Sequence, residues 1–242
     1  MEVGTDTRVL VTGGSRGIGA AIADAFEARG CTVGRVSRSG DPAADVADRD
    51  SITRAVEGFG RVDVVVANAG IAHYLPFAEM PPEQIEQLTS VNWLGTAYTV
   101  KAALPGLLER GHGHVVIVSS GAGIRSFPGA AVYGATKAAQ RGFGEALRHE
   151  LKGTGVGVTM VYPGQIRSDL HSHEKERMPD WYKLDRSVPP EPLAQAVVEA
   201  VEQGRREVFY PPTVRLLRIV HGLRPALADA LLRRIMHRSA AP

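Results

Sequence analysis

The chain has 242 residues, of which 44% are hydrophobic and 22% charged, and its net charge is only +2, a composition typical of one large globular domain or two small ones. Its single cysteine, Cys31, excludes an intrachain disulfide and a cysteine-rich metal site, and we expect it to be a small buried residue in a reducing compartment. No apolar run approaches the roughly 18 to 20 residues of a membrane span, and no signal peptide is visible, so we expect a cytoplasmic protein.

The predicted elements alternate between strand and helix along the chain. An apolar strand at residues 8–11 runs into the glycine-rich turn TGGSRGIG at residues 12–19, and a helix is predicted over residues 20–29. Pro105 is expected to bend or end one of the later helices. Further strands are predicted at residues 32–36, 62–67, 114–118, 156–161 and 207–210, and further helices at 49–59, 84–108, 131–152 and 193–202. This order predicts a single α/β domain, a doubly wound parallel sheet with helices on both faces and ligands at the carboxyl ends of the strands.

The C-terminal segment, residues 213–242, is predicted to be a basic amphipathic extension of a catalytic domain at residues 1–212. It holds six Arg and one Asp, a local charge of +5, and two short helical patterns at residues 214–223 and 226–236 that break at Pro225. We expect these helices to fold on the body or on a partner subunit with Arg outward. Binding to an anionic membrane surface is the less favoured alternative. Nucleic acid is disfavoured because no aromatic residue interleaves with the Arg.

The turn after the first strand has the chemistry of a phosphate-binding site. Its glycines permit close backbone approach, and the N-terminus of the following helix presents amide N–H groups and a partial positive charge to a pyrophosphate. A plain tight turn is the alternative for such a glycine set, but the position between a strand and a helix favours a dinucleotide. The candidate contacts are Gly13, Ser15, Arg16, Gly17, Ile18 and Gly19.

The end of the second strand predicts NADP(H) rather than NAD(H). An acidic residue at this place would hold the adenosine ribose hydroxyls, and an arginine would accept a 2′-phosphate. Here the strand ends in Ser37 and Arg38, and Arg16 offers a second cation for the same phosphate. The alternative is that Arg38 is a solvated surface charge and that Asp41 binds the ribose.

Tyr133 and Lys137 stand four residues apart in YGATK, at the start of the predicted helix 131–152. Residues at this spacing share one helix face, and an adjacent ammonium favours the phenolate form of a tyrosine. The small residues around the pair would let a flat cofactor and a substrate lie close to the helix. Ser119, Ser120 and Asn68 also follow predicted strands, so we expect all of these side chains at one edge of the sheet.

Several motifs together resemble the short-chain dehydrogenase/reductase family in its core, one-domain form with a Rossmann-like fold. The resemblance covers roughly residues 7 to 210. It rests on TGGSRGIG at 12–19, Asp45-Val46, NAG at 68–70, Asn92 in VNWLG, SS at 119–120, YGATK at 133–137 and PG at 163–164.

The resemblance implies a role for each matching residue. Tyr133 is the general acid in carbonyl reduction and the base in alcohol oxidation, and Lys137 lowers its pKa and hydrogen-bonds the nicotinamide ribose. Ser120 holds the substrate carbonyl, with Ser119 as a structural neighbour or a partner in that bond, and Asn92 supports a water in the proton relay or serves only as a buried amide. The implied cofactor contacts are Asp45 and Val46 at the adenine, Asn68, Ala69 and Gly70 near the ribose, and Pro163, Gly164, Ile166 and Ser168 along the nicotinamide.

Two departures from the family pattern bear on the cofactor and the substrate. Asp45 follows Ser37 by only eight residues, so the helix that family members carry there is expected to be lost or reduced to a loop. The C-terminus lacks the glycine-rich ending of acyl-carrier-protein ketoreductases and is similar to members acting on lipid-like, steroid-like or polyketide carbonyls. The expected substrate is therefore an apolar ketone or secondary alcohol.

Three further expectations complete the prediction. Residues 165–190 are polar and long enough to form a lid, and His171 and His173 within them are expected to be solvated because no third metal ligand is near. The family leads us to expect a homodimer or homotetramer built on the helices at 84–108 and 131–152. An epimerase or dehydratase on the same fold, or a non-catalytic nucleotide-binding protein, are the alternative functions.

Overall fold

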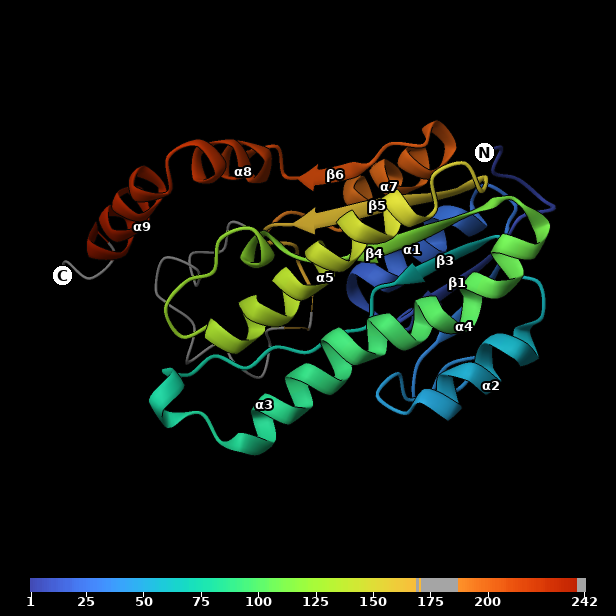
Figure 1. Ribbon diagram of the computed structural model, residues 1–242, viewed down its shortest axis with the longest axis horizontal. Coiled ribbons are helices and arrows are strands. Elements are labelled where there is room, and N and C mark those ends of the chain that lie inside the picture. Colours follow the sequence, from blue (N-terminus) through green and yellow to red (C-terminus); the bar gives the residue numbers. More distant parts are fainter. Residues whose placement is uncertain (169, 171–186, 239–242) are drawn as a thin grey trace.

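The computed structural model describes residues 1–168, 170 and 187–238, and in these residues a six-stranded sheet lies between two layers of helices (Figure 1). The strands are β1 (Arg8–Thr12), β2 (Thr32–Val36), β3 (Val64–Ala67), β4 (Gly113–Val118), β5 (Val156–Pro163) and β6 (Glu207–Tyr210). The helices are α1 (Gly17–Glu27), α2 (Arg49–Phe59), α3 (Pro82–Leu88), α4 (Gly95–Arg110), α5 (Ala131–Glu150), α7 (Glu191–Gln203), α8 (Thr213–Leu223) and α9 (Pro225–Arg238).

The strand order is β2-β1-β3-β4-β5-β6, and every neighbouring pair is parallel. The chain adds β2 on one side of β1 and then crosses to add β3 on the other side, so the carboxyl ends of β1 and β3 form the switch point where such sheets bind ligands. Helices α1 and α7 cover one face of the sheet, and α2, α4 and α5 cover the other (Figure 1). The predicted doubly wound α/β fold is confirmed.

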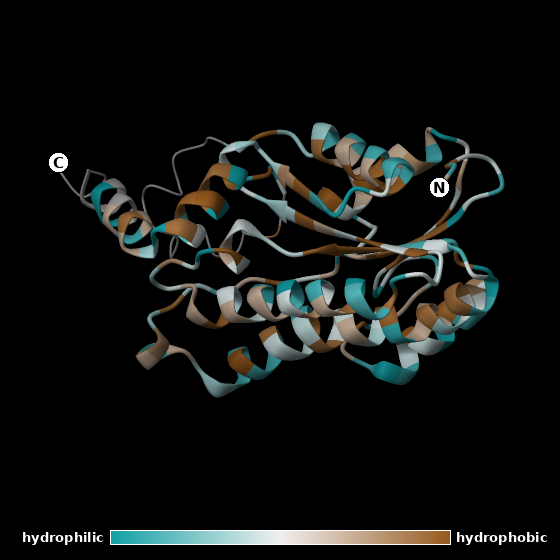
Figure 2. Ribbon diagram, turned by 45° about the horizontal axis from the view of Figure 1, so that its top comes forward, coloured by the Kyte–Doolittle hydropathy of each residue, from teal (hydrophilic) through white to brown (hydrophobic). Residues whose placement is uncertain are grey.

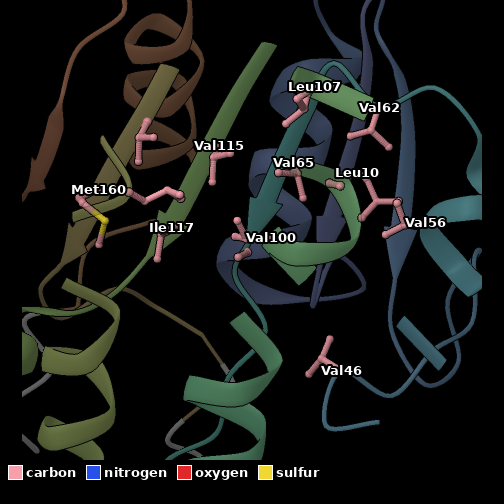
Figure 3. Packing of buried hydrophobic residues seen from close by; sticks show 14 of the residues in the cluster. Leu10, Val46, Val56, Val62, Val65, Val100, Leu107, Val115, Ile117 and Met160 are labelled. Carbon is pink, nitrogen blue, oxygen red and sulfur yellow. The ribbon is translucent and has the colours of Figure 1, made fainter. Parts of the chain in front are cut away.

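The central strands are buried on both faces. Successive side chains of a strand point to opposite sides, so Val9 and Val11 of β1 pack in one apolar cluster with Phe26 of α1, while Leu10 packs in the other with Val100 of α4 (Figure 3). The burial on both sides explains why these strands read in the sequence as continuous apolar runs.

The predicted helix at residues 84–108 is one part of a longer helical segment over residues 82–110. It consists of α3, a π-helical turn (Thr89–Leu94) and α4. Pro105 was expected to bend or end the helix, and it does not end it, because α4 continues to Arg110 and stops at Gly111, which has a left-handed φ of 66°. Pro105 is exposed, so the carbonyl that loses its hydrogen-bond donor lies on the side of the helix nearest to water.

The segment between β2 and α2 contains no helix in residues 37–48, all of which the structure describes. The chain instead turns back on itself, so that Asp41 lies beside Arg35 and Ala43 beside Ser37. Helix α2 then begins after Asp48, whose carboxylate accepts hydrogen bonds from the N–H groups of Asp50 and Ser51. The loss of the usual helix, expected from the short spacing, is therefore observed.

The two helices of the C-terminal extension form where the sequence predicts them, separated at Arg224 with Pro225 at the start of α9. They project past the end of β6, at the same end of the molecule as the carboxyl ends of the strands (Figure 1). The expectation that Arg faces outward is wrong for Arg218, which lies over the rings of Tyr162 and Phe209, 5.7 and 5.9 Å from their centroids. No helix among the described residues is both long and apolar enough to cross a bilayer.

The N-terminus lies at the other end of the sheet (Figure 1). The ammonium of Met1 donates a hydrogen bond to the carbonyl oxygen of Glu202, 3.1 Å away, near the end of α7. A cation is favourable at this end of a helix, where the carbonyl oxygens carry a partial negative charge.

Candidate active site

A cleft opens at the carboxyl ends of β1, β3, β4 and β5, at the switch point of the sheet. Most of the predicted site residues line it, and so does Ser119, which was expected as a structural neighbour of Ser120 or a partner in its bond to the substrate. Two further lining residues, Val118 and Leu170, were given no role. The predicted residues on its wall are Gly13, Arg16, Gly17, Ile18, Gly19, Asn68, Gly70, Ser120, Tyr133, Lys137, Pro163, Gly164, Ile166 and Ser168.

The N-terminus of α1 faces this cleft without a side-chain cap. Arg16 occupies the N-cap position with an extended backbone, and its side chain makes no capping hydrogen bond to the first turn. Gly17 has a φ of 57°, which a residue with a side chain rarely adopts, and it turns the chain into the helix. The unpaired N–H groups and the helix dipole make this a suitable place for an anion such as a pyrophosphate.

Gly19 allows α1 to pack directly against the glycine turn. A Cβ at Gly19 would lie 2.1 Å from the carbonyl oxygen of Gly13 and 2.4 Å from Nδ2 of Asn68. That Asn68 amide donates a hydrogen bond to the carbonyl oxygen of Thr12, at 3.0 Å. The cleft floor is therefore a close contact of backbone with backbone, and this packing alone requires glycine at position 19.

Thr12 joins the ends of β1 and β3, although the sequence analysis gave it no role. Its hydroxyl accepts hydrogen bonds from the N–H groups of Asn68 and Ala69, at 3.1 and 3.2 Å, and donates to the carbonyl oxygen of Val66. The signal was available, because a threonine that ends an apolar strand just before a glycine turn has a hydroxyl placed to bond the neighbouring strand.

Tyr133 and Lys137 lie together on the buried face of α5, as their spacing predicts. The Lys137 Nζ atom donates to the carbonyl oxygen of Val118 at 3.2 Å and lies 5.9 Å from the centroid of the Tyr133 ring. Both side chains are almost completely buried. The pair is thus held between the end of β4 and the cleft.

The pKa values of the pair differ from the sequence-based expectation. Burial raises the pKa of Tyr133 to about 12, although its hydrogen bond with Ser120 has the opposite, smaller effect. Burial likewise lowers the pKa of Lys137 to about 8. The net pKa of Tyr133 is therefore raised, whereas the sequence-based expectation was a lowered value, because loss of solvation disfavours the charged form of each group.

The two serines after β4 have different surroundings. Ser120 hydrogen-bonds the Tyr133 phenol, and its Oγ also accepts from the N–H of Ala122 at 3.1 Å. Ser119 is buried and donates to the backbone carbonyl of Lys137 at 2.8 Å, which holds α5 against β4. Only Ser120 therefore has its hydroxyl beside the phenol, and Ser119 has the structural contact.

Asn92 sits in the π-helical turn, fully buried behind the cleft wall. Its Oδ1 accepts from the N–H of Ile71 at 2.8 Å, and its Nδ2 donates to the carbonyl of Ile71 and to Thr136 Oγ1. A Cβ at Gly70 would lie 3.2 Å from Asn92 Oδ1 and 3.4 Å from Lys137 Nζ. Gly70 therefore keeps open the space between the Asn92 amide and the Lys137 ammonium.

Gln140 is a second buried amide that the sequence analysis missed. Its Nε2 donates to the backbone carbonyl of Asn92 at 2.9 Å and to Thr96 Oγ1 at 2.7 Å, so α5 is bonded to the π-helical turn. The sequence did contain a signal, because Tyr133, Lys137 and Gln140 stand at i, i+4 and i+7 and so share one helix face. A polar residue on the buried face of the catalytic helix needs a hydrogen-bond partner.

The surroundings of Gly134 show a different reason for the small residues in YGATK from the one expected. A Cβ at Gly134 would lie 2.1 Å from Oγ of Ser126, in the loop that precedes α5. The small residue therefore makes room for this loop, whereas the sequence analysis attributed it to a cofactor and a substrate.

The remaining predicted residues lie outside the cleft wall. Val46 is buried against Gly95, and the Asp45 carboxylate accepts from the N–H of Ala47. Ser15 and Arg38 are exposed. Ser37, Ala69 and Asn92 complete this group. Of the predicted lid at residues 165–190, positions 169 and 171–186 lie outside the described residues, as do His171 and His173, and the described part of the chain has no cluster of three metal-ligating side chains.

Known proteins that are similar to this chain include oxidoreductases, which agrees with the residues found in the cleft. Residues 7–179 match the sequence model of a family described as short chain dehydrogenase. A protein of Myxococcus xanthus (strain DK1622), described as an uncharacterized oxidoreductase, is 34% identical over 220 residues, which make up 89% of this chain and 82% of that protein.

Two solved structures with a bound cofactor are also similar. A serine dehydrogenase in its closed form, complexed with NADP+, has a TM-score of 0.75 at 30% identity and covers 84% of this chain and 92% of its own. A short chain dehydrogenase/reductase from Burkholderia phymatum in complex with NAD has a TM-score of 0.81, with coverage of 93% and 97%. At a sequence identity of 21%, this similarity supports the fold alone.

The contact of α1 with the glycine turn predicts opposite effects of two Gly→Ala substitutions. We expect Gly19→Ala to lower the free energy of unfolding by about 1–3 kcal/mol, because its Cβ overlaps backbone atoms. Gly142→Ala is the matched control. Gly142 lies exposed in α5 with no atom within 4 Å of a Cβ, so we expect a gain of up to about 1 kcal/mol. Urea unfolding measures both, and equal stability of the two variants would contradict the packing described.

Proposed function

The chain belongs to the short-chain dehydrogenase family, and we propose that it transfers a hydride between NADP(H) and an apolar ketone or secondary alcohol. One observation carries this proposal. Ser120, Tyr133 and Lys137 lie on the wall of the same cleft that the uncapped N-terminus of α1 faces, so a proton donor and a pyrophosphate site share one cavity.

The proposed chemistry assigns the proton to Tyr133. NADPH held with its pyrophosphate at the N-terminus of α1 would supply the hydride to the carbonyl carbon. Ser120 donates a hydrogen bond to the carbonyl oxygen, Tyr133 gives that oxygen its proton, and the Lys137 ammonium stabilises the phenolate that remains. The space that Gly70 leaves beside Asn92 Oδ1 and Lys137 Nζ suits the proposed relay water, which would return a proton to the site.

Burial, which raises the pKa of Tyr133 to about 12, keeps the phenol protonated at neutral pH. A phenol with a pKa of about 12 carries its proton at pH 7, which is the form that carbonyl reduction needs. Oxidation of an alcohol needs the phenolate instead. We therefore propose that the protein acts as a carbonyl reductase, and Val118, Ile166 and Leu170 on the cleft wall support an apolar substrate.

The choice of NADP(H) rests on residues beside the end of β2. Arg16 and Arg38 are both exposed, and neither has an ion-pair partner within the part of the chain that the structure describes. The Ser37 hydroxyl is buried without a hydrogen-bond partner there. Asp41, the alternative ribose ligand, lies beside Arg35, which is one residue before the end of the strand. Two exposed guanidinium groups that have no ion-pair partner among the described residues suit a 2′-phosphate.

We also propose a homo-oligomer formed through the outer sides of α4 and α5. Trp93, in the π-helical turn just before α4, and Phe143 of α5 form an edge-to-face pair with ring centroids 5.4 Å apart, and both are only partly buried in the single chain. Aromatic side chains of this kind are enriched in protein interfaces.

Removal of the phenol tests the assigned proton donor. We expect Tyr133→Phe to lower kcat by about 10²- to 10⁴-fold, because it deletes only the hydroxyl. The measurement is absorbance at 340 nm with a panel of ketones and alcohols, and Tyr98→Phe on α4 is the control. Full turnover by Tyr133→Phe would remove the proposed mechanism, and turnover of substrate without net change in reduced cofactor would indicate an epimerase or dehydratase.

The two pKa values predict opposite pH dependence in the two directions. Lys137, with a pKa of about 8, loses its charge as the pH rises through 8, so we expect kcat/KM for ketone reduction to fall above that pH. Alcohol oxidation needs the phenolate of Tyr133, so we expect its kcat/KM to increase toward alkaline pH. Initial rates from pH 6 to 10 test both, and a reduction rate that increases across this range contradicts the assignment.

A charge reversal at the end of β2 tests the cofactor preference. We expect Arg38→Asp to shift the preference from NADPH toward NADH, because the carboxylate repels a 2′-phosphate and accepts hydrogen bonds from ribose hydroxyls. The ratio of kcat/KM for the two cofactors is the measurement. Arg206→Asp, an exposed position at the opposite end of the sheet, is the matched control, and an initial preference of the unmodified protein for NADH would overturn the proposal.

A further inference from the structure

Helix α8 exposes a row of large apolar side chains to solvent. Leu216, Ile219 and Leu223 are 61%, 49% and 78% exposed, and their spacing of three and four residues puts them on one side of the helix. We refer to these three residues as the outer face of α8. Leu227 on α9 is 47% exposed as well. Brown segments mark the apolar residues of α8 in Figure 2.

The opposite side of α8 holds the helix to the body through a cation. Arg218 contacts Glu207 at 3.0 Å and Glu145 at 3.7 Å and lies over the Tyr162 and Phe209 rings, which are stacked at 5.0 Å. A surface helix normally buries its leucines and exposes its arginines. Here the arginine faces the body and the leucines face water, so the orientation of α8 leaves apolar area available for another surface.

The charges beside the outer face of α8 indicate which kind of surface would bind to it. Arg215 and Arg224 are exposed, and neither has an ion-pair partner among the residues that the structure describes. Asp229, the single acidic residue of positions 213–242, pairs with Arg125 at 2.6 Å. A second copy of this face would bring cations against cations, whereas an anionic surface complements apolar side chains with a rim of free arginines.

The position of α8 places such a surface next to the cleft. Val214, at the start of α8, is buried, and its Cγ2 atom lies 3.0 Å from where a Cβ of Gly164 would be. Gly164 itself lines the cleft. Both C-terminal helices stand at the end of the molecule where the strands terminate, and so does the cleft (Figure 1).

We propose that the outer face of α8 docks this protein on a bilayer of anionic phospholipid. Leu216, Ile219 and Leu223 enter the interfacial region, and Arg215 and Arg224 contact the headgroup phosphates. The helix lies in the plane of the interface and does not cross the bilayer. This proposal is independent of the reductase activity, because it uses none of the residues assigned to catalysis or to the cofactor.

Co-sedimentation of the full chain with vesicles tests the docking. Large unilamellar vesicles of phosphatidylcholine with 30% phosphatidylserine, a composition on the order of an anionic leaflet, are compared with pure phosphatidylcholine. We expect binding to the anionic vesicles at low salt. We expect the triple variant Leu216→Gln, Ile219→Gln, Leu223→Gln to lower the partition coefficient by about 100-fold or more, because three exposed apolar side chains are lost. Arg215→Gln with Arg224→Gln should lower it by roughly 5-fold per charge.

The controls separate this docking from its alternatives. Leu108→Gln, at a leucine that is 42% exposed at the far end of α4, should leave binding unchanged, and circular dichroism verifies that each variant is folded. Binding that survives in the leucine variant, or that is equal on neutral vesicles, overturns the proposal. No vesicle binding, together with a smaller oligomer of the leucine variant in size-exclusion chromatography, would assign the face to a second copy instead and would also overturn it.

Discussion

Hydrogen bonds between Thr12 and the backbone of Asn68 and Ala69 hold the ends of β1 and β3 together at the place where the chain reverses its direction across the sheet. A parallel sheet leaves a crevice there because the connections leave in opposite directions. The side-chain amide of Asn68 lies against the glycine turn, so the position of α1 depends on this junction. The cleft is therefore a property of strand order, and its phosphate-binding chemistry follows from how closely α1 can approach.

Burial determines the chemistry of the other wall. Burial withdraws the Tyr133 phenol and the Lys137 ammonium from water, which raises the pKa of the phenol and lowers the pKa of the ammonium, so both groups are shifted toward their neutral forms. The hydrogen bonds of Lys137 to Val118 and of Ser119 to Lys137 fix the helix against β4. Buried amides at Asn92 and Gln140 complete the support behind the wall, and they connect α5 to the π-helical turn.

The sequence predicted the strands to within two residues, because their apolar runs and their glycine turns are local signals. The sequence also predicted that Tyr133, Lys137, Ser120 and the glycine turn lie at one edge of the sheet, because the carboxyl ends of parallel strands all lie at that edge. The sequence-based predictions were wrong for features that depend on tertiary contacts and burial. The continuation of α4 past Pro105 depends on exposure, the need for Gly134 depends on Ser126, and the direction of the Tyr133 pKa depends on burial. The orientation of Arg218 likewise follows from an aromatic stack that only the folded chain assembles.

The two ends of the chain have different consequences for handling the protein. Met1 lies at the amino-terminal end of the strands and bonds the end of α7, far from the cleft (Figure 1). An affinity tag or a fusion partner joined there would be remote from the substrate, and it would replace only the hydrogen bonds of the Met1 ammonium to the carbonyl oxygens of Val201 and Glu202. A tag after α9 would instead sit at the cleft end, beside the leucines of α8. Immobilisation through the N-terminus therefore leaves both the cavity and the C-terminal helices facing the solution.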